Sequence, residues 1–166
     1  MGNIPLPKVE IPTSTGGDLP ERILVRGVNW LGDAVMTTPA LDRLREARPT
    51  AQITLLSPAN LADLWQHHPS VDRVLTFTNS DNIWQIARRL RRERFDLALV
   101  LPNSSRSALE VWLAGIPVRL GYAASGRSWF LTRPLPQRSG AVPMRKRSVA
   151  EIRLLLQAIP PKKSAV

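Results

Sequence analysis

The chain has 166 residues, 43% of them hydrophobic and 22% charged, which is the composition of a globular protein with one core. It contains no cysteine, which excludes disulfide bonds and thiolate metal sites, and no apolar run reaches the ~18 residues of a membrane span. The net charge is +10, and residues 101–166 carry 11 basic but only 2 acidic side chains. Such a field attracts phosphates, carboxylates, nucleic acid or an anionic bilayer, or it only aids solubility.

Residues 1–20 are rich in proline, glycine and threonine and predict a flexible leader. Strand-like and helix-like segments then alternate along the chain. The predicted strands are 22–28, 51–57, 73–77, 95–101 and 117–121. The predicted helices are 34–48, 60–67, 105–115 and 149–159. A further helix is predicted from the apolar stripe of Ile83, Ile86, Ala87 and Leu90.

Two stretches interrupt this regular alternation. Pro39 is expected to kink the first helix or to restart it with Thr38 as cap, and residues 123–147 predict an irregular basic loop. The alternation itself predicts an α/β fold, a Rossmann-like parallel sheet with helices on both faces, because parallel strands need crossovers that cover the sheet.

The turn after the first predicted strand reads GVNWLGD over residues 27–33. Ligands of open α/β sheets bind at the carboxyl ends of strands, so this turn is a candidate site. Its glycine spacing fails the dinucleotide pattern, and Asp33 stands where a phosphate loop needs lysine. Asp33 is therefore an ordinary helix cap, or a general base for a sugar hydroxyl that Gly32 allows to approach closely.

Two segments resemble a known family. Residues 22–44 read RILVRGVNWLGDAVMTTPALDRL, and residues 95–122 read FDLALVLPNSSRSALEVWLAGIPVRLGY. The first resembles the opening motif of glycosyltransferase family 9, the lipopolysaccharide heptosyltransferases, and the second resembles the corresponding stretch of its heptosyltransferase II group. Both occur in the family's order and on predicted strand-to-helix turns, and the resemblance extends over roughly residues 22–159.

The resemblance implies the amino-terminal half of a GT-B fold, in which two Rossmann-like domains face each other. In the family, the first domain holds the lipid-linked acceptor and the second holds the donor substrate, ADP-heptose. The implied reaction inverts the anomeric centre, needs no metal or cofactor, and transfers heptose to the heptosyl-Kdo-lipid A inner core of lipopolysaccharide. Asp33 matches the aspartate of the motif, which implies that Asp33 is the general base.

Further residues are candidates for acceptor binding. Asn29 is a sugar ligand or a turn asparagine. One of Asn103, Ser104 and Ser105 is expected to cap the next helix while the others face the acceptor.

Three arginines are candidates for binding the anionic groups of the acceptor. Arg106 lies at a predicted helix start, where a cation is unfavourable unless an anion binds. Arg26 and Arg119 pair with acceptor phosphates or Kdo carboxylates, or they are solvated surface charges. Trp30 and Trp112 are expected in the core rather than as platforms for sugars.

The sequence predicts a leader at 1–20, an acceptor-binding domain at 21–159 and the start of a linker at 160–166. Because the family is much longer than this chain, the donor-binding domain is expected to be absent. The chain alone is then expected to transfer no sugar at a meaningful rate. Its donor half would come from a separate chain; the alternative is a non-catalytic fragment or an acceptor- or anion-binding interaction module. We expect a cytoplasmic location with peripheral contact to the anionic inner membrane, and no nucleic acid partner, because no aromatic stacking array accompanies the basic residues.

Overall fold

The computed structural model describes residues 22–123 and 126–135 of the chain. Its strands are β1 Arg22–Arg26, β2 Gln52–Pro58, β3 Arg73–Phe77, β4 Leu97–Val100, β5 Val118–Tyr122 and β6 Arg133–Leu135. They form one parallel sheet in the order β3-β2-β1-β4-β5-β6. This is the strand order of the Rossmann fold, so the predicted fold class is confirmed.

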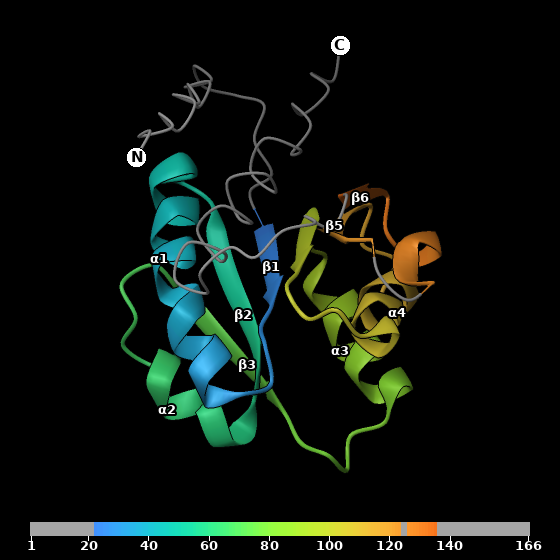
Figure 1. The fold of residues 1–166 in the computed structure, drawn as a ribbon, viewed down its shortest axis with the longest axis horizontal. Helices are drawn as coiled ribbons and strands as arrows, with labels where there is room; N and C mark the ends of the chain where they lie inside the picture. Colours follow the sequence, from blue (N-terminus) through green and yellow to red (C-terminus); the bar gives the residue numbers. More distant parts are fainter. Residues whose placement is uncertain (1–21, 124–125, 136–166) are drawn as a thin grey trace, which may run out of the picture.

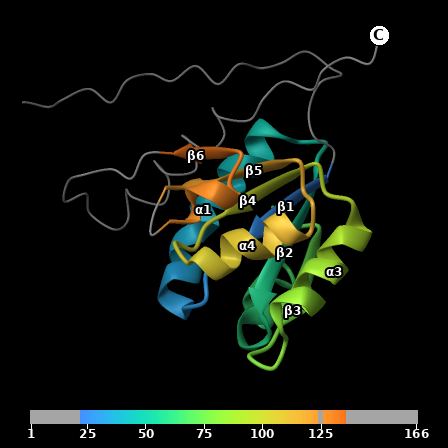
Figure 2. The ribbon, with the colours of Figure 1, turned by 90° about the vertical axis from the view of Figure 1, so that its right-hand side faces the viewer.

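Helices cover both faces of the sheet (Figures 1 and 2). They are α1 Leu31–Ala47, the 3-10 helix η1 Ala59–Leu61, α2 Ala62–Trp65, α3 Ile83–Glu93, α4 Ser105–Leu113 and the 3-10 helix η2 Arg127–Phe130. Helices α1 and α2 pack on one face, and α3 and α4 pack on the other. Strand β1 serves both cores, since Ile23 and Val25 face the first core and Leu24 faces the second.

Helix α1 runs without interruption through Pro39, so the predicted restart at Thr38 is wrong. Proline removes the hydrogen bond to the carbonyl of Val35, four residues earlier. Both Pro39 and Val35 are exposed, and water can satisfy that carbonyl. The opposite side of the helix is held by packing, because Leu41 and Leu44 are fully buried against the sheet.

Helices α3 and α4 begin at side-chain caps. Asn82 and Gln85 form a capping box in which each side chain accepts the backbone N–H of the other residue at 2.9 Å. Ser104 caps α4 by accepting the N–H of Ser107 at 3.2 Å, which confirms that one residue of the 103–105 group is a cap. The predicted apolar stripe of α3 is buried at Ile86, Ala87 and Leu90.

The predicted irregular loop at 123–147 is wrong at η2 and β6, which both lie within it. Strand β6 has only three residues, Arg-Pro-Leu, and is mostly exposed, so it lacks the apolar run that marks a buried strand. The predicted leader at 1–20 and the predicted helix at 149–159 lie outside the described residues. No helix within the described ranges has the length and apolarity of a transmembrane span.

Two tryptophans predicted for the core lie at the surface instead. The side chain of Trp30 is 75% exposed and that of Trp112 is 46% exposed. Trp30 precedes the first turn of α1, at a corner where little packs over it. Trp112 follows the buried Val111 by one residue, which turns its side chain by about 100° away from the buried stripe of α4.

Candidate functional site

A cavity of about 690 Å³ opens where the carboxyl ends of β1, β2, β3 and β4 meet. Ligands of Rossmann-like sheets bind at this edge, near the point where the strand order reverses between β1 and β4. Its walls come from the ends of these strands and from the segments that follow them: Arg26, Asn29, Trp30, Pro58, Ala59, Asn60, Phe77, Thr78, Asn79, Ser104 and Arg106. The predicted turn after the first strand therefore forms one wall of the cavity.

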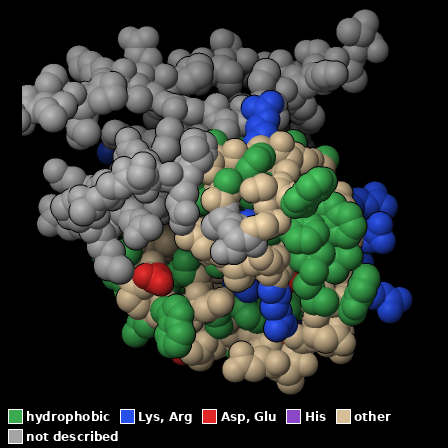
Figure 3. Space-filling view, turned by 45° about the vertical axis from the view of Figure 1, so that its right-hand side comes forward, with side chains coloured by type: hydrophobic (Ala, Val, Ile, Leu, Met, Phe, Trp, Pro, Cys, Tyr) green, Lys and Arg blue, Asp and Glu red, His purple; other side chains and the backbone are tan. Residues whose placement is uncertain are grey.

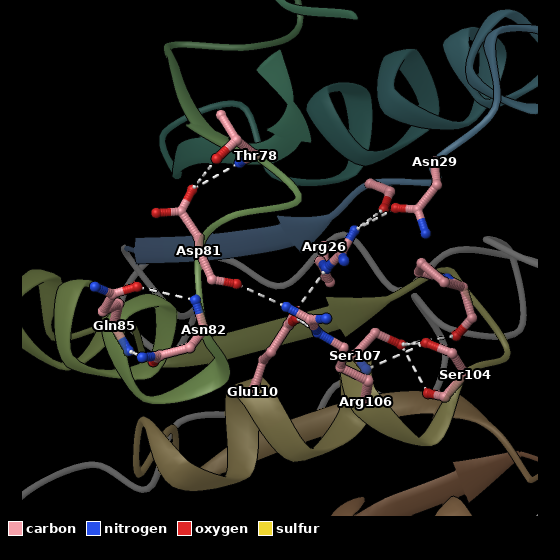
Figure 4. A network of polar contacts seen from close by, with 12 residues as sticks. Arg26, Asn29, Thr78, Asp81, Asn82, Gln85, Ser104, Arg106, Ser107 and Glu110 are labelled. Atoms are coloured by element: carbon pink, nitrogen blue, oxygen red, sulfur yellow. Dashed lines mark hydrogen bonds and ion pairs between the residues drawn. The ribbon is translucent and has the colours of Figure 1, made fainter. Parts of the chain in front are cut away.

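Arg26 is the last residue of β1, and its side chain is only 3% exposed. Its Nε donates to Oε2 of Glu110 at 2.9 Å, in an ion pair with a fully buried carboxylate. Its Nη1 donates to the Gly27 carbonyl at 2.6 Å and to Oδ1 of Asn29 at 3.1 Å. The guanidinium also lies over the ring of Phe77, 4.4 Å from its centroid. Arg26 thus fixes Asn29 and α4 relative to β1 (Figure 4).

Arg106 lies in the first turn of α4, on the same wall as Ser104. Its Nη2 donates to the Asp81 carbonyl at 2.9 Å, and its Nε lies 3.4 Å from Oε1 of Glu110. These two partners offset the unfavourable position of a cation at a helix amino terminus. The side chain remains 54% exposed, so Arg106 is the more accessible of the two cations that line the cavity.

A short turn positions the wall that follows β3. The carboxylate of Asp81 accepts the Thr78 N–H at 2.6 Å and the Thr78 hydroxyl at 3.1 Å. These bonds favour the charged carboxylate and hold the pKa of Asp81 below its ordinary value. The same residue accepts Arg106 through its carbonyl, so the turn and the start of α4 are joined (Figure 4).

Asp33 is exposed in the first turn of α1, next to the cavity wall rather than in it. The cap position belongs to Trp30, which lines the cavity and whose side chain makes no capping bond. The side chain of Asp33 forms no hydrogen bond or ion pair with any other residue that the structure describes. Its negative charge is favourable near the helix amino terminus. No atom lies within 4 Å of a Cβ built on Gly32, so the space beside Asp33 is open.

The remaining predicted residues lie at different distances from this cavity. Ser104 lines it, and Asn103 and Ser105 are exposed beside it without being part of its wall. Arg119 lies apart, in β5, where its Nε donates to the Phe130 carbonyl at 2.7 Å and its Nη1 donates to the Ile116 carbonyl. Burial lowers the pKa of Arg119. The structure therefore brings together Arg26, Asn29, Ser104 and Arg106, and it leaves Arg119 outside.

The wall residues at the ends of β2 and β3, namely Asn60, Phe77, Thr78 and Asn79, were not predicted from the sequence, and neither was the carboxylate partner Glu110. The first four lie at or just after the ends of predicted strands, where ligands of open α/β sheets gather. Within the described ranges, no three His, Asp or Glu side chains cluster as a metal site would require. Amides, hydroxyls, an exposed indole and an accessible guanidinium are groups that bind a polyol with acidic substituents.

Comparison with known proteins agrees with the fold and the motifs. The profile of glycosyltransferase family 9 (heptosyltransferase) matches residues 83–158. Lipopolysaccharide heptosyltransferase 2 of Escherichia coli is 35% identical over 112 residues, which are 64% of this chain and 32% of that protein. This chain thus spans about a third of the length of that relative.

Solved structures give the same result for the fold. The E. coli ADP-heptose lipopolysaccharide heptosyltransferase II structure superposes with a TM-score of 0.71 and 32% identity, over 79% of this chain and 40% of that chain. A family 9 glycosyltransferase from Veillonella parvula superposes with a TM-score of 0.73 over 84% of this chain and 42% of that chain, and at 20% identity it shows the fold alone. Residues 83–158 therefore match glycosyltransferase family 9 (heptosyltransferase), and the fold matches one half of the GT-B heptosyltransferase structures.

Proposed function

We propose that this domain binds the inner-core acceptor of lipopolysaccharide in the cavity at the strand ends, and that Asp33 is the general base for heptose transfer from ADP-heptose. The names of the relatives support the class of reaction, since they are heptosyltransferases of lipopolysaccharide. The proposal locates the domain in the cytoplasm, at the membrane face that presents the acceptor. The donor would be bound by a second domain of the GT-B arrangement.

The observation that carries the proposal is the exposed carboxylate of Asp33 in the first turn of the helix that starts at the cavity rim. A general base must reach the proton that it accepts, and Asp33 has no partner among the described residues that would have to be displaced first. The open space beside Gly32 gives an acceptor sugar room to approach. An ordinary capping role does not explain Asp33, because the cap is Trp30.

The chemistry follows from these positions. An acceptor hydroxyl oxygen attacks the anomeric carbon of ADP-heptose while the carboxylate of Asp33 takes the hydroxyl proton. The bond from the anomeric carbon to the diphosphate breaks, its electrons leave with ADP, and attack from the opposite side inverts the centre. The negative charge that develops on the diphosphate needs cationic or backbone donors, which the second domain would supply.

Acceptor binding is assigned to the polar wall. Arg106 would meet a phosphate or a carboxylate of the inner core, because it is the accessible cation of the cavity. The side-chain amides of Asn29, Asn60 and Asn79 can bind sugar hydroxyls, and the exposed Trp30 ring offers an apolar face to a sugar ring. Arg26 would act mainly by holding Asn29 in place.

The first test is binding of a soluble inner-core oligosaccharide to the full chain, measured by calorimetry. Arg106→Ala should weaken binding at least about tenfold, since a charge-assisted hydrogen bond contributes about 1.5–3 kcal/mol. Arg43→Ala, which removes an exposed arginine from α1, is the matched control. Equal affinities of the Arg106 and Arg43 variants would show that the acceptor does not bind in this cavity.

The second test addresses Asp33. In a chimera, this chain replaces the matching part of the E. coli enzyme, and heptose transfer is measured with and without Asp33→Asn. The asparagine variant should bind the acceptor normally and lose about 10²–10⁴-fold in turnover, because a general base contributes a factor of that size. If the asparagine variant transfers heptose at the unmodified rate, Asp33 is not the general base, and the domain would then be an acceptor-binding module.

A further inference from the structure

The surface formed by α3, α4 and η2 carries exposed tryptophans and arginines that the proposed reaction does not use. We infer that this surface, called the outer face below, binds an anionic membrane. The outer face consists of Trp84, Arg88, Arg91 and Arg92 on α3, Trp112 on α4 and Trp129 on η2. The inference deepens the proposed function, because a membrane-bound domain would meet the lipid-linked acceptor in the bilayer. Only the identity of the acceptor rests on the proposed function.

Three of the five tryptophans of the chain belong to the outer face. Trp84 is 67% exposed, Trp112 is 46% exposed and Trp129 is 89% exposed. Each comes from a different element, and α4 packs against both α3 and η2. Tryptophan is enriched at the boundary between headgroups and acyl chains, where its ring is buried and its N–H stays polar.

The same face is cationic. Arg88, Arg91 and Arg92 are exposed, and their guanidinium groups make no hydrogen bond or ion pair within the described residues. The only acidic residues in α3, α4 and η2 are Glu93 and Glu110, and both are ion-paired. The charge of the outer face is therefore uncompensated, and an anionic lipid surface is complementary to it.

Contacts at both ends of the helices show that α3 and α4 lie side by side and run in the same direction (Figure 2). At their starts, Arg106 of α4 donates to the Asp81 carbonyl just before α3. At their ends, the Arg91 guanidinium approaches Gly115, with Nη2 3.9 Å from a Cβ built there. Figure 3 shows a broad apolar area on this side of the molecule with Lys and Arg side chains next to it.

Helix α4 links the outer face to the cavity. Arg106, at the start of α4, lines the cavity, and the same helix contributes Trp112 to the outer face. A lipid-linked sugar held at the cavity would therefore have its lipid part near the outer face. Single-stranded nucleic acid would also be attracted to arginine and tryptophan, but it needs a basic groove that follows its backbone. The partly buried Leu109, Leu113 and Phe130 near Trp112 suit the acyl boundary better.

The experiment is flotation of the full chain with vesicles of phosphatidylcholine, with and without phosphatidylglycerol. The chain should bind the anionic vesicles, and Arg88→Glu and Arg91→Glu should each weaken binding by at least about fivefold, the effect of one arginine at such a surface. Trp84→Ser and Trp129→Ser should weaken it at low and at high salt. The controls are Arg43→Glu on α1 and Leu64→Ser on α2, which lie on the opposite side of the sheet.

Bromine-labelled lipids provide a second measurement that does not need disruptive variants. Their quenching of tryptophan fluorescence should fall strongly in Trp84→Phe and Trp129→Phe. The inference would be overturned if the chain did not bind vesicles, or if the variants bound vesicles as the unmodified chain does. It would also be overturned if the variants lost binding to a single-stranded oligonucleotide but kept binding to vesicles. Binding of the soluble oligosaccharide is measured separately, so failure at the membrane can be told apart from failure of the proposed function.

Discussion

Replacing Glu110 with leucine should leave the Arg26 guanidinium buried without its carboxylate partner. The pair is closed at 2.9 Å, and the two side chains are 3% and 0% exposed, so water cannot take the place of the missing carboxylate. Breaking a buried ion pair from one side costs about 3–5 kcal/mol, because the remaining charge stays desolvated. Arg26 keeps the Gly27 carbonyl, Asn29 and the Phe77 ring, which favours the lower limit, about 3 kcal/mol.

Thermal unfolding followed by circular dichroism measures this effect. At about 2–4 °C per kcal/mol for a chain of this size, Glu110→Leu should lower Tm by about 6–12 °C. The double variant Arg26→Met/Glu110→Leu removes both charges and should recover most of the loss. Arg43→Ala breaks an exposed pair with Glu46, and it should lower Tm by less than about 2 °C. A Glu110→Leu shift no larger than that of Arg43→Ala would refute the reasoning.

Two further predictions concern the sheet and the cavity wall. Gly121→Ala should lower the free energy of unfolding by about 1–3 kcal/mol, because its Cβ would lie 2.6 Å from Nη2 of the buried Arg127. Gly32→Ala, which meets nothing within 4 Å, should not lower it in the same chemical denaturation assay. The lowered pKa of Asp81 means that its bonds to Thr78 are present above the ordinary value of about 3.9 and are lost as the pH falls through the lower folded value. The NMR shift of the Thr78 amide proton should titrate below that ordinary value, and a midpoint at or above it, or a titration that persists in Asp81→Asn, would contradict this.

The fold was predictable where packing leaves a periodic signal. The nearly unbroken apolar run at residues 95–101 predicted a strand covered on both faces, and all four residues of β4 are buried. The stripe of α3 predicted which side packs on the sheet. Strand β6 gave no such signal, because an exposed edge strand of three residues buries too little apolar surface to impose one.

The site was predictable only in part, because its contacts join residues that are distant in sequence. The turn at 27–33 was identified from its position after a strand, and it forms one wall of the cavity. Nothing in the sequence pairs Arg26 with Glu110, which lies 84 residues further along. Trp112 was misplaced because one residue of helical phase decides between core and surface, and a large apolar side chain next to buried neighbours is ambiguous.

Helix α4 contributes side chains both to the cavity and to the outer face, because its residues point to different sides of one short helix. Glu110 points inward to the last residue of β1, Arg106 lines the cavity, and Trp112 points outward. With 3.6 residues per turn, Arg106 and Glu110 lie about 40° apart on one side of the helix and Trp112 lies about 200° from Glu110, so the inward ion pair fixes the other two. Loss of that pair should therefore disturb acceptor binding and membrane binding together, whereas replacing Arg106 or Trp112 should change mainly one of them.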